Sequence, residues 1–322
     1  MKKIKINIAY GFSLIWIACL LFMACDKSKP YEELSNDKDG AMVFIAKANN
    51  DMQQLTMFPY EKRTLKFNVG FGALGLPAED IHISMSEDMH AFDSLNTIRQ
   101  ANGEAAYVKF PSAAYAIDQL NFTIPKGSVS SDYATLSYDP ETFDPEKDHL
   151  LALSITDASG YTISPAAKTL LIVAPKLEER AADTKGWIAT ASTEQLSGEN
   201  TGLASAVLDG DLNTIWHSRY SGGTRSSYPH WLSIDMLKST YVTKIAMAPR
   251  QNNANGFTKF KLEGSTDGKT WFTLGDNLSF DPANKAYQSY EIEPQYLRNI
   301  KITMLEGLQD LTFLAEFVVY TY

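Results

Sequence analysis

Oxygen-bearing side chains are concentrated in one short stretch of the chain, residues 206–217, which reads AVLDGDLNTIWH. Asp209, Asp211 and Thr214 can turn side-chain oxygens and peptide carbonyls toward one point, while the apolar residues between them anchor the loop to a core. A hard cation such as calcium takes about six to eight oxygen ligands in irregular geometry. The stretch therefore predicts a metal-stabilised loop in a binding module. The alternative is an Asp-Gly turn without a metal.

The same stretch begins like an EF-hand calcium loop, because Asp209, Asp211 and Asn213 alternate. An EF-hand loop also requires glycine at its sixth position and glutamate at its twelfth. The chain has Thr214 and Tyr220 at those positions. The EF-hand interpretation is therefore excluded.

Catalytic motifs are missing from the sequence. There is no His-Glu-x-x-His zinc motif and no Gly-x-Ser-x-Gly nucleophile motif. Residues 264–270, GSTDGKT, resemble a phosphate-binding loop but are one residue too short between the glycines. Glycoside hydrolysis needs two placed carboxylates, which composition alone does not exclude. Both halves of the chain are nevertheless accounted for as β-sandwiches, so we expect no enzyme.

The N-terminus has the pattern of an export signal. Three lysines within the first five residues precede an apolar run over residues 6–24, and the composition turns polar after Cys25. We expect residues 1–24 to be a signal peptide; a membrane-spanning helix is the alternative, for which this run is marginal. The sequence FMAC at residues 22–25 resembles a bacterial lipobox, which implies that Cys25 is lipidated. The protein would then be an outer-membrane lipoprotein, facing the cell surface or the periplasm.

The charge of the chain limits its partners. The formal charge is −9, and removal of the three signal lysines takes it to −12. Nucleic-acid binding requires a basic stripe, so this class is excluded. Attraction to anionic lipid by charge is excluded for the same reason, and neutral ligands suit the chain better. Residues 25–40 are polar and predict a flexible tether.

The length predicts two domains. We place them at residues 41–174 and 187–322, joined by a polar linker at 175–186. Short apolar or alternating runs separated by turn signals are typical of antiparallel β-sandwiches. No long segment of the first domain has a convincing helical period, so the predicted class is all-β. Its expected strands cover residues 42–45, 64–69, 81–85, 119–124, 133–138, 150–155 and 168–174.

The second domain shows clearer strands. Asp267-Gly268 predicts a tight hairpin turn. Four of the five tryptophans lie in this domain, and we expect Trp216 and Trp271 in its core. Its expected strands cover residues 187–192, 231–236, 242–247, 257–262, 299–304 and 316–320.

Three motifs of the first domain carry a resemblance: FPSAAY at 110–115, TIPKGS at 123–128 and LLALSI at 150–155. They resemble the domain of unknown function that precedes glycan-related modules in lipoproteins of Gram-negative glycan-utilising bacteria. The resemblance implies an immunoglobulin-like β-sandwich that acts as a spacer or platform. It transfers no site residue.

Five motifs of the second domain occur in the order of a known family. They are LDGDLNTIWH at 208–217, PHWLSID at 229–235, IAMAPR at 245–250, LEGSTDGKTW at 262–271 and AEFVVY at 315–320. The domain resembles the factor V/VIII type C, or discoidin, family, which includes carbohydrate-binding module family 32. The resemblance implies a discoidin-type jelly-roll β-sandwich with one structural Ca²⁺. The implied ligands are oxygen atoms of Ala206, Asp209, Asp211, Thr214, Ala315 and Glu316.

The same resemblance implies a shallow sugar site in the loops at residues 217–230 and 249–257. The preferred ligand-binding residues are His217, Arg219, Tyr220, Arg250 and Asn255. Second choices are Tyr228, His230 and Phe257. For each residue the alternative is a solvated loop position or a local hydrogen-bond partner, and for His230 a structural role is favoured.

The implied function is a lipid-anchored, non-catalytic protein of the cell envelope that captures carbohydrate. Neighbouring glycan-uptake proteins or glycoside hydrolases would be its partners. The alternative is an adhesin or a structural accessory lipoprotein that binds a protein partner.

Overall fold

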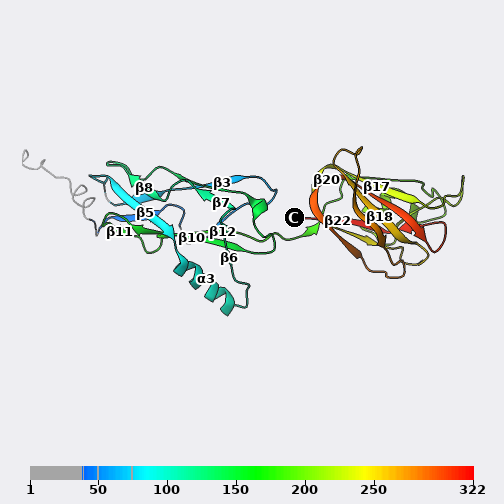
Figure 1. The fold of residues 1–322 in the computed structure, drawn as a ribbon, viewed down its shortest axis with the longest axis horizontal. Helices are drawn as coiled ribbons and strands as arrows, with labels where there is room; N and C mark the ends of the chain where they lie inside the picture. The colour runs from blue at the N-terminus through cyan, green and yellow to red at the C-terminus, as the bar shows by residue number, and fades with distance from the viewer. Residues whose placement is uncertain (1–37, 39, 49–50, 74) are drawn as a thin grey trace, which may run out of the picture. The chain divides into compact units, whose positions relative to one another are not determined.

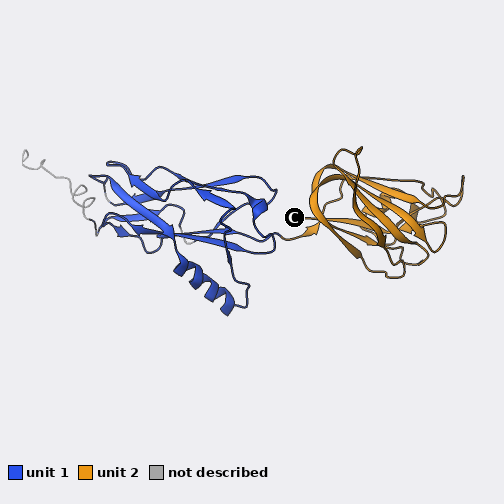
Figure 2. Cartoon of the chain, viewed as in Figure 1, with its two compact units in different colours: residues 1–177 blue, residues 178–322 orange. Residues whose placement is uncertain are grey.

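The computed structural model describes residues 38, 40–48, 51–73 and 75–322. The chain divides into two compact units between Leu177 and Glu178 (Figure 2). Strands account for 46% of the structure and helices for 7%, which confirms the all-β class. The expected signal peptide and Cys25 lie outside the described residues. Within those residues, no helix combines the length and the apolar character needed to span a membrane.

The described part of unit 1 contains three sheets (Figure 1). The largest has the order β2-β12-β10-β5-β8, with β6 paired to β10, and the others have the orders β11-β1-β4 and β3-β9-β7. The first sheet consists of β2 (Gln53–Gln54), β5 (Ile81–Glu87), β6 (Val108–Lys109), β8 (Asn121–Ile124), β10 (His149–Asp157) and β12 (Thr169–Ala174). The others consist of β1 (Met42–Ile45), β3 (Arg63–Phe67), β4 (Val69–Gly72), β7 (Tyr115–Ile117), β9 (Ala134–Tyr138) and β11 (Thr162–Ile163).

Alternation along these strands builds the core of unit 1. On β5, Ile81, Ile83 and Met85 are buried while the residues between them face outward. Successive side chains of a strand point to opposite faces, so this pattern fixes which face of the sheet is covered. The alternating strands expected from the sequence are thus explained by burial on one side.

Unit 1 also contains a helix that the sequence interpretation missed. Helix α3 (Met89–Ala101) follows β5 directly, and Figure 1 shows it projecting from the side of the strands. Asp88 caps it, because its Oδ1 accepts a hydrogen bond of 2.9 Å from the N–H of Ala91. None of its residues is buried. A short 3₁₀ helix, η2 (Pro140–Thr142), follows β9.

Unit 2 is built on one large sheet and one small sheet. The large sheet has the order β13-β22-β17-β20-β18-β19, with β14 paired to β17, and the small sheet has the order β15-β16-β21. The first contains β13 (Arg180–Ala181), β14 (Ile188–Ala191), β17 (His230–Ala248), β18 (Phe257–Ser265), β19 (Phe272–Ser279), β20 (Gln288–Gly307) and β22 (Glu316–Thr321). The second contains β15 (Thr201–Gly202), β16 (Ile215–His217) and β21 (Phe313–Leu314), and the 3₁₀ helix η3 (Ala204–Leu208) precedes β16.

Two strands expected near residues 231–236 and 242–247 are parts of the single strand β17. Between them Leu237 adopts a φ of 64°, and the pairing with β20 shifts register between Asp235 and Thr240. The residues after this bulge pair with β22 as well as with β20. A β-bulge of this kind bends a strand without ending it.

Part of the expected linker is structured within unit 2. Arg180 and Ala181 form β13, which pairs with Thr321 and Tyr320 of β22. Just before this strand, Glu179 accepts a 2.6 Å hydrogen bond from the Thr243 hydroxyl.

The core of unit 2 lies on one face of β17. Leu232, Ile234 and Met236 are buried, and they pack with Trp216, which is fully buried as expected. Complete burial of one such aliphatic side chain stabilises a fold by roughly 1.5–3 kcal/mol. The residues between them point to the opposite face of the sheet.

Candidate functional site

Three loop segments of unit 2 meet at one end of the sandwich: residues before β15, residues before β16 and residues after β17. They enclose a pocket of about 300 Å³. The pocket is lined by Glu199, Asn200, Leu212, Asn213, Ile215, Arg250, Gln251 and Asn252. We call it the loop-end pocket.

Glu199 links the charged groups of this pocket. Its Oε2 lies 3.0 Å from a terminal nitrogen of Arg250, and its Oε1 lies 3.9 Å from Nε2 of His217. Arg250 also donates from Nε to Oδ1 of Asn252 at 2.7 Å. The Glu199 and Arg250 side chains are only 14% and 19% exposed, so water screens this ion pair weakly.

The protonation of His217 follows from its contacts. Nδ1 lies 2.6 Å from the carbonyl oxygen of Ser218, and a carbonyl only accepts, so Nδ1 carries the proton. Burial lowers the pKa of His217, against opposing contributions from the Ser218 carbonyl and the Glu199 carboxylate. The ring is therefore neutral at pH 7, which leaves a free lone pair on Nε2.

An aromatic wall supports these polar groups. The ring of Phe313 lies 5.3 Å from the His217 ring and is covered on one face by the Arg250 guanidinium, 5.3 Å from its centroid. Tyr220 packs edge-on against His217 at 5.1 Å. Cation–π and aromatic contacts of this kind hold planar side chains in fixed orientations.

Gln195 fixes the backbone of the loop that carries His217. Its side-chain nitrogen donates to the carbonyl of Ser197 and the hydroxyl of Ser221, both at 2.8 Å. Its side-chain oxygen accepts from the N–H groups of Tyr220 at 2.9 Å and Ser221 at 3.1 Å. Gln195 is 1% exposed and fully hydrogen-bonded, so it rigidifies the loop.

The acidic loop predicted to hold a cation is compact. Asp209 follows η3, and its Oδ2 accepts a 2.7 Å hydrogen bond from the Thr214 hydroxyl. Its Oδ1 accepts from the N–H of Asp211 at 2.9 Å. The Asp211 carboxylate is turned toward Asn213, whose N–H and side-chain amide donate to its Oδ1 at 2.9 and 2.8 Å. The Asp211 carbonyl accepts from the N–H and the hydroxyl of Thr214 at 3.0 and 2.9 Å, so both oxygen-bearing groups of Asp211 are held within the loop.

Glu316 closes this loop from the first residue of β22. It is 2% exposed, and its Oε1 has no hydrogen-bond partner within the described part of the chain. Burial, followed by the neighbouring Asp209 carboxylate, raises the pKa of Glu316 to about 8, against the N–H groups of Gly210 and Asp211. Asp209 itself is exposed, so a proton or a cation between the two carboxyl groups would relieve the unfavourable environment of the buried Glu316.

These contacts test whether the residues fit calcium. An orphaned carboxylate oxygen, a second carboxylate and the Thr214 hydroxyl face one another, which is the oxygen chemistry that calcium takes. In residues 38, 40–48, 51–73 and 75–322, no group of three or more His, Cys, Asp or Glu side chains is gathered closely enough to hold a metal. The donor set therefore fits only with backbone carbonyls included, as expected for Ala206 and Ala315.

Comparison with known families agrees with this arrangement. Residues 188–317 match the model of the F5/8 type C domain. Unit 2 therefore resembles an F5/8 type C domain over most of its length. Residues 36–162 match a model described as the N-terminal domain of another family. The two resemblances predicted from the sequence are thus confirmed.

Curated relatives match parts of the chain. A galactose oxidase of Gibberella zeae is 28% identical over 176 residues, which cover 53% of this chain and 25% of the relative. A sialidase of Micromonospora viridifaciens is 33% identical over 85 residues, covering 26% of this chain and 13% of the relative. The chain spans a quarter or less of the length of these curated relatives.

Solved structures of similar domains include two from Clostridium perfringens. A family 32 carbohydrate-binding module in complex with GalNAc-β-1,3-galactose is 27% identical, with a TM-score of 0.41; the match covers 44% of this chain and 99% of that one. Another, in complex with galactose, is 27% identical over the same shares, with a TM-score of 0.39.

Other predicted ligand residues of the F5/8 type C domain lie beside the pocket. Arg219 is half-buried, and its N–H donates to the Thr193 hydroxyl at 3.0 Å. Asn255 is exposed, and its N–H donates to the side chain of Asn253 at 2.9 Å. Neither residue lines the loop-end pocket. Of the five preferred residues, Arg250 lines it, and His217 and Tyr220 pack around its charged groups.

The second-choice residues have structural surroundings. Phe257 is fully buried and stacks on Phe280 at 4.4 Å, so the prediction that it contacts a ligand is wrong. His230 is 1% exposed, and its Nε2 lies 2.7 Å from the carbonyl of Asp310. Tyr228 packs on His230 with ring centroids 4.7 Å apart. The structural role favoured for His230 matches this burial.

Glu199 and Phe313 are among the residues of the site that escaped the sequence interpretation. Glu199 stands in a polar loop without a motif, and Phe313 precedes the Ala-Glu pair that was assigned to the metal. Their roles come from packing between segments far apart in the chain. The one available signal was that a half-buried arginine such as Arg250 needs a carboxylate partner.

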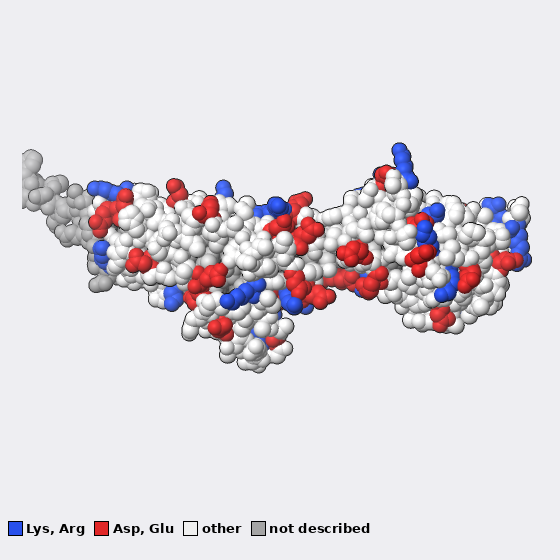
Figure 3. All heavy atoms as spheres, in the orientation of Figure 1, with Lys and Arg blue, Asp and Glu red and all other residues white. Residues whose placement is uncertain are grey.

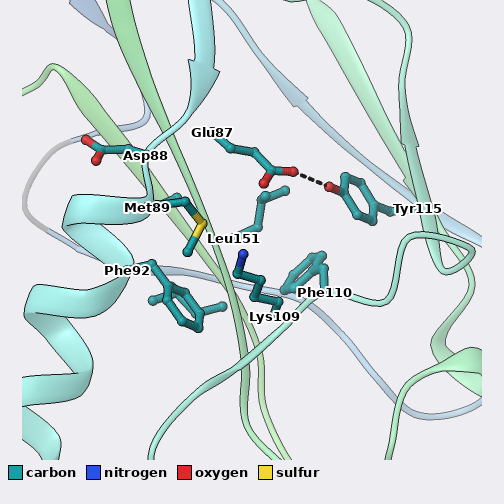
Figure 4. A pocket seen from close by; sticks show the side chains of 10 residues that line it. Glu87, Asp88, Met89, Phe92, Lys109, Phe110, Tyr115 and Leu151 are labelled. Atoms are coloured by element: carbon teal, nitrogen blue, oxygen red, sulfur yellow. Dashed lines mark hydrogen bonds between the residues drawn. The ribbon is translucent and has the colours of Figure 1, made fainter.

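A hollow also occurs in unit 1, outside the F5/8 type C domain. Figure 4 shows it between helix α3 and the strands, with Phe92, Lys109 and Tyr115 around it. The Tyr115 hydroxyl donates to Glu87 at 2.8 Å, and burial followed by this contact raises the pKa of Tyr115 to about 12. The volume is about 40 Å³, enough for one or a few waters and too small for a sugar ring.

The face drawn in Figure 3 carries charges of both signs. On the face shown in Figure 3, acidic and basic side chains of the described residues are interspersed, without a continuous basic stripe. A protein that binds a phosphate backbone concentrates its lysines and arginines in one stripe or patch.

Proposed function

We propose that unit 2 binds carbohydrate in the loop-end pocket. The observation that carries this proposal is the ion pair of Glu199 and Arg250 in the lining of the pocket, with His217 held beside Glu199. Sugar hydroxyls both donate and accept hydrogen bonds, and planar polar side chains match neighbouring hydroxyls. The family match supports this class of ligand, as do relatives named for acting on galactose or as a sialidase.

Each polar group has a distinct part in the proposed binding. Arg250 donates to hydroxyl oxygens, Glu199 accepts a hydroxyl proton, and the bare Nε2 of His217 accepts another. The ion pair with Glu199 and the hydrogen bond to Asn252 orient Arg250 before the ligand arrives. Less conformational entropy is then lost on binding.

We propose that calcium is held by Asp209, Thr214 and Glu316, with carbonyls of Ala206, Asp211 and Ala315. When bound, the ion supplies positive charge that offsets the two adjoining carboxylates. The protein residues join the loop before β16 to the start of β22. The proposed role is structural, because the loop carries the strand that ends in His217.

We propose further that the chain is a non-catalytic lipoprotein of the outer membrane, attached through Cys25. Unit 1 would act as a spacer between the anchor and the sugar-binding domain. Captured glycan would pass to neighbouring uptake proteins or glycoside hydrolases. Substitution of Cys25 by alanine is expected to release the chain from the membrane fraction, and retention there would contradict lipid attachment.

A glycan panel tests the binding proposal. The full chain is expected to bind a subset of neutral, galactose-type glycans, and Arg250→Ala should abolish this binding. Arg225→Ala is the matched control, because Arg225 is an exposed loop arginine. Silence of the unmodified chain on all glycans, or equal binding by the Arg250→Ala variant, would contradict the proposal.

A further inference from the structure

A second hollow of unit 2 lies on the outer face of its large sheet. Its volume is about 200 Å³, and it is lined by Thr190, Trp231, Ser233, Trp271 and Lys301. None of these residues belongs to the loop-end pocket or to the acidic loop. Trp271, which was expected in the core, is only half-buried and forms one wall.

Strand register gathers these residues. Thr190 of β14 pairs with Ser233 of β17, and Ser233 pairs with Lys301 of β20, so the three form a row across the sheet. Trp231 lies two residues before Ser233 and therefore on the same face. Trp271 reaches the row from the hairpin before β19. The result is a shallow surface site held by the sheet itself, so its geometry is rigid.

Two indole rings flank one ammonium group in this hollow. Nζ of Lys301 lies 5.8 Å from the ring centroids of both Trp231 and Trp271. The ammonium lies over both rings at the outer limit of a weak cation–π contact. The indole faces provide flat apolar area for the C–H face of a pyranose ring, and the hydroxyls of Thr190 and Ser233 lie beside it.

The charge of Lys301 selects the ligand. Within the residues that the structure describes, the ammonium group of Lys301 forms no ion pair and no hydrogen bond. The acidic residue opposite it on β18 is Glu263, and the Glu263 carboxylate is already bound by Lys261 at 2.9 Å. A surface ammonium between two aromatic rings therefore has its charge available for an anionic group.

We propose that this hollow is a second sugar-binding site, specific for a uronic acid residue of an acidic polysaccharide. The pyranose ring stacks on Trp231 and Trp271, and its carboxylate pairs with Lys301. Stacking alone would accept many neutral sugars, so the ammonium supplies the selectivity. The site is independent of the loop-end pocket, and the two sites allow one domain to bind two different sugars of a glycan.

Calorimetric titration of the full chain with trigalacturonate tests the proposal, with the fully methyl-esterified trisaccharide as the uncharged counterpart. The acid is expected to bind and the ester to bind about tenfold or more weakly, because the ester lacks the charged partner of Lys301. Lys301→Met should weaken binding of the acid to the level of the ester, whereas Lys301→Arg should retain binding of the acid. Trp271→Ala should remove binding of both.

Controls separate this site from the loop-end pocket and from misfolding. Arg250→Ala is expected to leave trigalacturonate binding unchanged, so loss of the proposed neutral-sugar site does not affect this test. Indole N–H signals of Trp231 and Trp271 should shift in the NMR spectrum when the acid is added, which needs no variant. Equal binding of acid and ester, unaltered binding by Lys301→Met, or absence of both heat and indole shifts would overturn the proposal.

Discussion

Arg250 and Glu199 form a 3.0 Å ion pair that joins the loop after β17 to the loop before β15. The pair is largely shielded from water, and His217 lies on the other oxygen of the same carboxylate. Glu199 therefore orients two side chains at once. Loss of its charge would leave Arg250 partly buried without its anion, which makes this carboxylate a sensitive test of the site.

Glu199→Gln is expected to weaken sugar binding while the domain stays folded. Glutamine keeps the size of the side chain but cannot form the ion pair, and the loss of one charge-assisted hydrogen bond costs about 1.5–3 kcal/mol, or roughly tenfold or more in Kd. Titration with the best glycan of the panel measures this change. Glu293→Gln serves as the control, since Glu293 is exposed. Unchanged affinity of the Glu199→Gln variant would contradict an orienting role.

Calcium removal is expected to lower the melting temperature of unit 2. A ligand that binds only the folded state at one hundred times its Kd adds about 2.7 kcal/mol to the free energy of unfolding. Glu316→Gln should remove most of the calcium-dependent gain, because one of the two adjoining carboxylates is lost. Without calcium the same variant should melt higher than the unmodified chain near pH 7, since burial, followed by Asp209, raises the pKa of Glu316 to about 8 and folding of the unmodified chain must therefore take up a proton.

Scanning calorimetry of both chains, with added calcium and with a chelator, checks this prediction. Ser205→Ala is a suitable control, because Ser205 is an exposed residue of η3 close to the loop. A melting temperature that is the same with calcium and with chelator would exclude the ion as a structural element.

We expect the stability of unit 2 to depend on pH through the turn between β18 and β19. Hydrogen bonds from the N–H groups of Thr270 and Lys269 to Asp267 lower its pKa to about 2. A depressed pKa means that the folded state favours the carboxylate, so its stabilising contribution is complete above pH 4 and is lost as the pH falls toward 2. Asp267→Asn keeps an oxygen acceptor without a titrating charge.

The measurement is the melting temperature between pH 5 and pH 2. The melting temperature of the unmodified chain should fall more over this interval than that of the Asp267→Asn variant. The difference isolates the effect of Asp267 from that of the other acidic groups. Asp267→Ala should melt lower than either chain at pH 7, because the turn loses the hydrogen bonds that its N–H groups donate to the Asp267 carboxylate. Parallel curves for the unmodified chain and the asparagine variant would contradict the assignment.

The strands were predictable because burial on one face leaves an alternating pattern. The expected strand at residues 42–45 coincides with β1, and Asp267-Gly268 does form the turn between β18 and β19. Helix α3 was not predicted, since its apolar residues are only half-buried or exposed and its strongest signal is the single cap at Asp88. Likewise, nothing local marks the bulge that keeps β17 continuous through Leu237.

The residues of the site were predictable only where a side chain is of a type that commonly binds a ligand. His217 and Arg250 were chosen from the loops of the family, and both lie beside Glu199. Phe257 was chosen for its aromatic ring, yet a strand that starts at this residue turns the ring into the core. Whether an aromatic side chain of a loop points into the core or toward solvent depends on the adjoining strand. Sequence spacing does not determine this direction.

The loop that supports the site requires glycine at position 202. Its φ is 74°, and a Cβ added there would overlap the carbonyl oxygen of Gln195. Gly202→Ala is therefore expected to destabilise unit 2 by more than the roughly 1 kcal/mol of left-handed strain alone, because the segment that carries Gln195 must move. Gly222→Ala isolates the strain, since Gly222 has the same φ and no atom within 4 Å of its added Cβ. Chemical denaturation gives both free energies of unfolding.

Sugar binding should also weaken in Gly202→Ala alone, because Gln195 holds the Tyr220–Ser221 backbone next to His217. Equal destabilisation of the two variants would show that the contact with Gln195 adds nothing to the strain.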